Sequence, residues 1–89
     1  MPYIKKEDRQ YFDETIKAIS EDVANEGDLN YIFTSLLHDR IEVEGISYQT
    51  LNNLIGVLEC CKLELYRVLV GPYEDTKKKL NGSVSDLDK

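Results

Sequence analysis

Apolar residues recur at steps of three and four along residues 48–70, and this spacing is the period of one helical face. The apolar positions are Leu51, Leu54, Ile55, Leu58, Cys61, Leu65, Val68 and Leu69. Few side chains of the stretch are charged, so the face has little polar covering. At about 1.5 Å per residue, a helix of this length extends about 35 Å. We therefore expect one long apolar helix over 48–70 at the centre of a small domain.

Two shorter segments with helical spacing precede the central helix. Apolar residues predict a helix over 13–25, with Asp13 as its cap and Gly27 ending it in the left-handed conformation. Asp28 is the expected cap of a second helix over 28–43, which has Leu, Ile and Phe on one side. Since almost no loop separates these two segments, they are expected to form an antiparallel helical hairpin.

Glycine, serine and proline mark the remaining helix ends. The second helix is expected to fade near Gly45, and Ser47 is well placed to cap the central helix. The central helix should end or kink at Pro72, because proline lacks a backbone donor and its ring collides with the preceding turn. A last helix over 72–80 is expected to start with this proline and to close at Gly82.

These elements predict an all-α fold. The expected architecture is a small helical bundle in which the helical hairpin packs on the longer central helix, with a short C-terminal helix after Pro72. We expect a single domain over residues 1–89. Residues 1–12 are expected to form an N-terminal arm, and the polar residues 83–89 a loose tail.

The size of the chain bears on its assembly. A chain of 89 residues buries only about 60 to 65 per cent of its unfolded surface, so its stability margin is small. Small domains often bury additional apolar surface against a second copy of themselves. We therefore expect a homo-oligomer.

Charge and hydropathy narrow the choice of partners. The chain has a formal net charge of −6, whereas binding to a nucleic-acid backbone needs clustered Lys and Arg, so nucleic acid is not an expected partner. The basic run at 77–79 is short and has acidic residues on both sides. No apolar run approaches the ~18 residues that span a bilayer, and the first residues do not form the hydrophobic segment of a signal peptide. We expect no membrane partner and a cytoplasmic location.

Charged residues of the central helix are spaced for pairing. Glu59 and Lys62 are three residues apart, as are Glu64 and Arg67, so each pair lies on adjacent turns of one face. In one interpretation these charges pair within the helix and with polar residues of the hairpin, and so fix how the helices register. In this case removal of Arg67 would leave a buried carboxylate unpaired, at a cost of about 3 to 5 kcal/mol.

In the other interpretation the same cations form a binding site. Arg67 and Lys62, together with Tyr66 and Tyr31, would then bind an anionic ligand or the carboxylates of a partner. Tyrosine suits such a surface because it combines an apolar ring with a polar tip. Both interpretations stay open at the level of the sequence.

No catalytic signature is present in the sequence. His38 is the lone histidine and has no partner base, thiol or serine at an interpretable spacing. Cys60 and Cys61 diverge by about 100° on a helix, with Cys61 in the apolar stripe and expected in the core. Glu59 and Glu64 are five residues apart, which is not the Glu-x-x-Glu spacing of helical metal-dependent nucleotide pyrophosphatases. We therefore expect no catalytic residues, no metal and no cofactor.

Several short motifs are distributed from the N-terminus to about residue 84. They are MPYI at 1–4, GDLNY at 27–31, GVLE at 56–59, KLE at 62–64, YR at 66–67, PYED at 72–75 and NG at 81–82. In this pattern the chain resembles a family of short, uncharacterised proteins encoded by bacteriophages and bacteria. The resemblance implies a compact helical protein of phage or bacterial origin and assigns no activity.

The leading functional hypothesis is therefore a non-enzymatic helical binding protein of the phage or bacterial cytosol, engaging a host or phage protein. It fits the acidic charge, the six tyrosines and the absence of a catalytic signature. The alternative is an oligomeric binder or sequestering protein for an anionic small molecule such as a nucleotide signal. A metal-dependent nucleotide hydrolase comes third.

Overall fold

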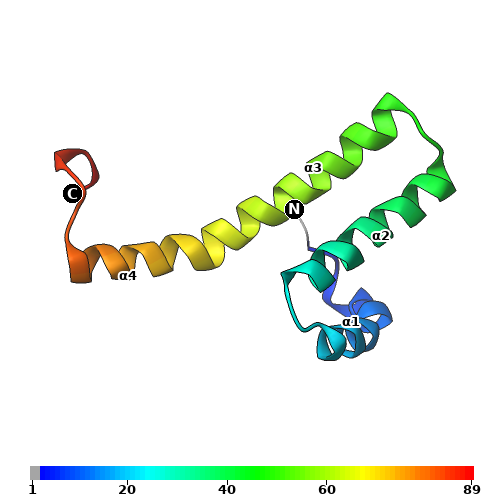
Figure 1. Cartoon of the computed structure of the whole chain (residues 1–89), viewed down its shortest axis with the longest axis horizontal. Helices are drawn as coiled ribbons and strands as arrows, with labels where there is room; N and C mark the ends of the chain where they lie inside the picture. Colours follow the sequence, from blue (N-terminus) through cyan, green and yellow to red (C-terminus); the bar gives the residue numbers. More distant parts are fainter. Residues whose placement is uncertain (1–2) are drawn as a thin grey trace. The chain divides into compact units, whose positions relative to one another are not determined.

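A computed structural model describes residues 3–89, and its helices are joined by short turns (Figure 1). The elements are a 3₁₀ turn η1 (Lys6–Asp8), α1 (Gln10–Asp22), α2 (Glu26–Glu44), α3 (Tyr48–Leu65), a π-helical turn η2 (Tyr66–Val70), α4 (Gly71–Asn81) and a 3₁₀ turn η3 (Asp86–Asp88). The part of the chain that is described contains no strand, which confirms the all-α class. The first two residues of the predicted N-terminal arm lie outside the described part.

The contacts within the chain divide it into two units, which we describe separately. Tyr3–Gly56 is the N-terminal unit and holds α1, α2 and the first half of α3. Val57–Lys89 is the C-terminal unit and holds the second half of α3, the π-helical turn and α4.

Helix α1 of the N-terminal unit begins earlier than predicted. The 3₁₀ turn η1 leads directly into it, and the backbone N–H groups of Phe12 and Asp13 both donate to the carbonyl of Arg9, each at 3.0 Å. Asp13 is therefore a first-turn residue and not the cap. The prediction that residues 10–12 belong to the arm is wrong, because the preceding turn already starts the helical hydrogen bonds.

The connection between α1 and α2 also differs from the prediction. Helix α1 ends at Asp22, and Asn25 caps α2 by accepting the backbone N–H of Asp28 at 2.9 Å. Asp28 accepts the backbone N–H of Ala24 in return, also at 2.9 Å. Gly27 lies in the first turn of α2 without a positive φ, so the predicted left-handed stop is wrong. The side chain of Asn25 supplies the cap, and no left-handed residue is needed.

The turn between α2 and α3 is as predicted. Gly45 ends α2 at φ 86° and ψ 155°, and its N–H donates to the carbonyl of Ile41 at 2.7 Å. Glycine reaches this conformation without the clash that a Cβ would cause. Ser47 caps α3 by accepting the backbone N–H of Thr50 at 3.1 Å. Both end signals read from the sequence are confirmed.

In the C-terminal unit the helical path continues past the position where an end or a kink was predicted. The N–H of Gly71 donates to the carbonyl of Tyr66, five residues earlier, so the turn before Pro72 is π-helical. A proline ring would collide with the carbonyl four residues before it in a regular α-helix, and the wider turn relieves this collision. Pro72 lies in the first turn of α4, and Gly82 ends this helix at φ 88°. Both of these positions are as predicted.

The tail contains local order that was not predicted. The hydroxyl of Ser85 accepts the backbone N–H of Leu87 at 3.1 Å, and the carboxylate of Asp88 accepts those of Ser85 at 2.9 Å and Val84 at 3.0 Å. These bonds form a capping box around the turn η3. They hold the pKa of Asp88 below its ordinary value of 3.8, because hydrogen bonds to Ser85 first and Val84 second favour the charged carboxylate.

The expected apolar core is not formed by the single chain. Thr50 is the buried residue of the described part, and no hydrophobic side chain there is buried. In the N-terminal unit no Cα atom of α1 lies within 8 Å of a Cα atom of α2. Closely packed helices have axes 8–10 Å apart, so these two do not interdigitate. The apolar face of α3 was expected to be dry and is exposed, including Leu51 and Ile55.

Candidate functional site

The apolar faces of α1 and α2 line an open groove within the N-terminal unit, here called the α1–α2 groove. Its volume is about 620 Å³. The lining residues are Ile16, Ile19, Ser20 and Val23 of the α1 side and Leu29, Ile32, Phe33 and Leu36 of α2. Ser20 is the one polar residue among them, so the groove offers mainly dispersion and hydrophobic contact to an occupant.

Helical periodicity explains why these residues share one surface. Ile16, Ile19 and Val23 lie at i, i+3 and i+7, which places them on one side of the first helical segment. The residues of α2 follow a similar spacing. Sequence reasoning found both apolar faces and predicted that the hairpin they form would pack on the central helix. In the structure Phe33 remains 53% exposed, so the two faces form the walls of the groove instead.

Acidic side chains flank the groove. An adjoining depression of about 310 Å³ shares Ile19, Val23 and Ile32 with it and is also lined by Asp22 and Asp28. The N-terminal unit as a whole has eleven Asp and Glu residues against five Lys and Arg. The C-terminal unit has six of each, so the entire net charge of −6 belongs to the N-terminal unit.

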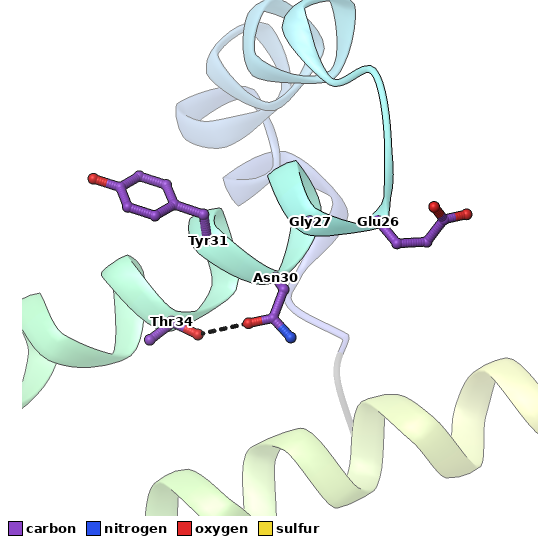
Figure 2. Close-up of a pocket in the computed structure, with 5 residues that line it drawn as sticks. All are labelled: Glu26, Gly27, Asn30, Tyr31 and Thr34. Carbon is purple, nitrogen blue, oxygen red and sulfur yellow. Dashed lines mark hydrogen bonds between the residues drawn. The ribbon is translucent and has the colours of Figure 1, made fainter.

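Tyr31, a predicted site residue, lies on α2 and is 74% exposed. It lines the depression just described and a second, shallow one of about 560 Å³ at the start of α2. Figure 2 shows the ring of Tyr31 and the side chain of Glu26 both pointing away from α2, in different directions. On the same helix the hydroxyl of Thr34 donates to the side-chain oxygen of Asn30 at 3.2 Å. Both depressions contain carboxylates and no Lys or Arg, so neither is suited to an anion.

The predicted cations belong to the C-terminal unit and pair within their own helix. The ammonium of Lys62 lies 2.9 Å from the carboxylate of Glu59. The guanidinium of Arg67 binds Glu64 through two nitrogens, at 2.6 Å and 3.4 Å. These pairs are the part of the first interpretation that lies within the helix; pairing with polar residues of the hairpin stays a prediction.

The predicted four-residue site is not assembled in any cavity described above. Lys62, Tyr66 and Arg67 lie in the C-terminal unit, whereas Tyr31 lies in the N-terminal unit. None of the three lines the α1–α2 groove or its neighbouring depressions. Tyr66 is exposed, as is the side chain of Arg67. A binding role for these residues stays a prediction.

Other reactive groups are dispersed. Within residues 3–89 no three His, Cys, Asp or Glu side chains are placed to hold a metal ion together. Cys61 was expected in the core and is exposed, as is its neighbour Cys60. His38 is exposed on α2. Among the described helices, none combines the length and apolarity needed to cross a membrane.

These features define the class as an all-α chain that leaves an apolar groove and an apolar helical face uncovered. The chain belongs to the family described as Domain of unknown function (DUF6899), which matches residues 1–84. This match confirms the expectation that the chain belongs to an uncharacterised family. Searches of curated proteins and of solved structures gave no match.

Proposed function

We propose that this chain is a non-enzymatic helical binding protein and that its partner is a protein. The observation that carries this proposal is the burial pattern: no hydrophobic side chain of residues 3–89 is buried. Folding ordinarily offsets lost conformational entropy by burying apolar surface. A chain whose apolar surface stays in contact with water obtains this stabilisation when another chain covers it.

The exposed apolar surface is organised and not scattered. Single exposed hydrophobic residues are normal on any protein, whereas contiguous apolar patches mark interaction sites. In the α1–α2 groove, apolar residues from two helices lie around one space of about 620 Å³. An amphipathic helix of a partner fits such a surface, since helix-in-groove recognition uses an apolar face at i, i+3 and i+7.

The resemblance to phage and bacterial proteins supports a cytoplasmic location. If a phage encodes the chain, this is the cytoplasm of the bacterial host. The acidic N-terminal unit supports a protein partner over a nucleic acid, because the groove is flanked by Asp22 and Asp28.

Binding of an anionic small molecule is the second candidate. The observation that favours it is the 67% exposure of the Arg67 side chain, which leaves the cation accessible. Glu64 already occupies this guanidinium, so an anion must compete with that carboxylate. Lys62 is paired in the same way with Glu59. The apolar groove therefore supports the protein-binding proposal more strongly.

Affinity capture with matched variants tests the proposal. Phe33→Lys places a charge in the groove, while Val43→Lys places the same charge on an exposed part of α2 away from it. Partners captured from a host lysate by the wild type are identified, purified and titrated against both variants. The proposal expects binding to be lost with Phe33→Lys and retained with Val43→Lys. Equal binding by both variants would overturn the assignment of the groove.

A further inference from the structure

The division of charge between the two units indicates what kind of protein surface fits the α1–α2 groove. Contact between two N-terminal units would set a net charge of −6 against another −6. Contact with the C-terminal unit avoids this repulsion, because that unit has six acidic and six basic residues and is neutral overall. Like-charge juxtaposition disfavours the first arrangement, particularly within the Debye length of about 8 Å.

The C-terminal unit also carries an apolar ridge of suitable form. Leu58, Cys61 and Leu65 lie at i, i+3 and i+7 on α3 and are all exposed. This is the spacing with which an amphipathic helix enters an apolar groove. We call these three residues the α3 ridge. The described part of each chain therefore has both an apolar groove and an apolar ridge with this spacing.

Reciprocal contact between two copies uses both surfaces at once. In a two-fold dimer the groove of each chain receives the ridge of the other, and the assembly closes without leaving either surface free. At about 50 Å² for each half-exposed side chain, the groove lining contributes roughly 350 Å² of apolar surface. With roughly 150 Å² from the three residues of the ridge and two such contacts, the dimer buries about 1,000 Å² of side-chain surface, which is close to the lower limit for a specific interface.

We propose that the α1–α2 groove binds the α3 ridge of a second copy of this chain in a reciprocal dimer. The proposal rests on the proposed function and names the partner of the same groove. It makes one prediction that other dimers do not share. Damage to the groove and damage to the ridge should each abolish the dimer, and one damaged chain should rescue the other.

Two variants and two controls test this by sedimentation velocity on the full chain. Phe33→Lys damages the groove, and Leu65→Lys damages the ridge. Val43→Lys controls for the first change on α2. Leu63→Lys controls for the second, because it lies on the same helix, 56% exposed against 57% for Leu65, but off the ridge. Circular dichroism of each variant checks that the helices are retained.

The expected result is a wild-type dimer, two variants whose dimer is weaker by about 100-fold or more, and two controls that dimerise normally. An equimolar mixture of Phe33→Lys and Leu65→Lys should recover dimer, because one intact groove then meets one intact ridge. Failure of the mixture to recover, or a normal dimer of Leu65→Lys alone, would overturn the proposal. A wild-type chain that stays monomeric yet binds another protein through Phe33 would overturn it too, while leaving the proposed function standing.

Discussion

Replacement of Arg67 by alanine distinguishes a scaffold role from an accessible surface charge. The guanidinium binds Glu64 one turn earlier on the same helix, at 2.6 Å. The arginine side chain is 67% exposed, whereas the glutamate is 16% exposed. Exposed pairs of this spacing contribute about 0.3 to 0.5 kcal/mol, because solvent screens the charges and two long side chains lose freedom.

The expected loss of stability for Arg67→Ala is therefore below about 1 kcal/mol, including a small contribution from leaving Glu64 without this partner. This is well below the 3 to 5 kcal/mol that a buried pair would give, the value expected under the scaffold interpretation of the sequence. The exposure of Arg67 favours the smaller value, because solvent screens a pair with one partner largely in water.

Urea unfolding followed by circular dichroism measures this cost at one fixed protein concentration, so that association does not enter the comparison. A double-mutant cycle with Glu64→Gln isolates the pair and should give a coupling of about 0.5 kcal/mol. A loss greater than about 2 kcal/mol for Arg67→Ala, with coupling of similar size, would refute this reasoning and make the pair part of the scaffold.

Three further predictions concern helix ends and the tail. Gly45→Ala should destabilise the chain by about 1 to 3 kcal/mol, because φ 86° with ψ 155° is essentially restricted to glycine. Gly56→Ala should stabilise it by up to about 1 kcal/mol, since the added Cβ meets open space in α3. Thermal unfolding of both variants measures these changes. Asn25→Ala should cost about 1 kcal/mol and increase amide exchange in the first turn of α2. The depressed pKa of Asp88 means that its capping bonds are fully present above pH 3.8 and are lost as pH falls through the lower pKa of the folded chain; the Ser85 amide resonance should titrate in that acidic range, and an unchanged resonance would contradict this.

Helix positions could be predicted from the sequence mainly where the signal is local. Ser47, Gly45 and Gly82 each act on their own turn, and the structure places all three as expected. The start of α2 was predicted at Asp28 because aspartate is a good cap. In the structure Asn25 is the cap, and the carboxylate of Asp28 accepts the backbone N–H of Ala24. Asn25 and Asp28 lie three residues apart and have similar capping propensity, so composition alone does not separate them.

The π-helical turn and the open groove depend on more than one residue. Pro72 indicated a break or a kink, but its spacing does not say whether the chain absorbs the collision by ending the helix or by widening one turn. Periodicity likewise identified Phe33 as part of an apolar face. Periodicity does not distinguish a face that is buried within one chain from a face that is covered by a second chain, since both cases require the same pattern. For Arg67 the sequence left open whether it pairs with Glu64 or is exposed for binding, and in the structure its side chain is both paired and exposed.

Sedimentation equilibrium of the full chain tests most directly whether another chain covers the apolar faces. The groove and the α3 ridge predict a mass above 10.3 kDa that rises with concentration, with the helices becoming more resistant to urea as the dimer forms. A mass of 10.3 kDa at every concentration, together with cooperative unfolding that does not depend on concentration, would contradict it, because a single chain would then bury its own apolar surface.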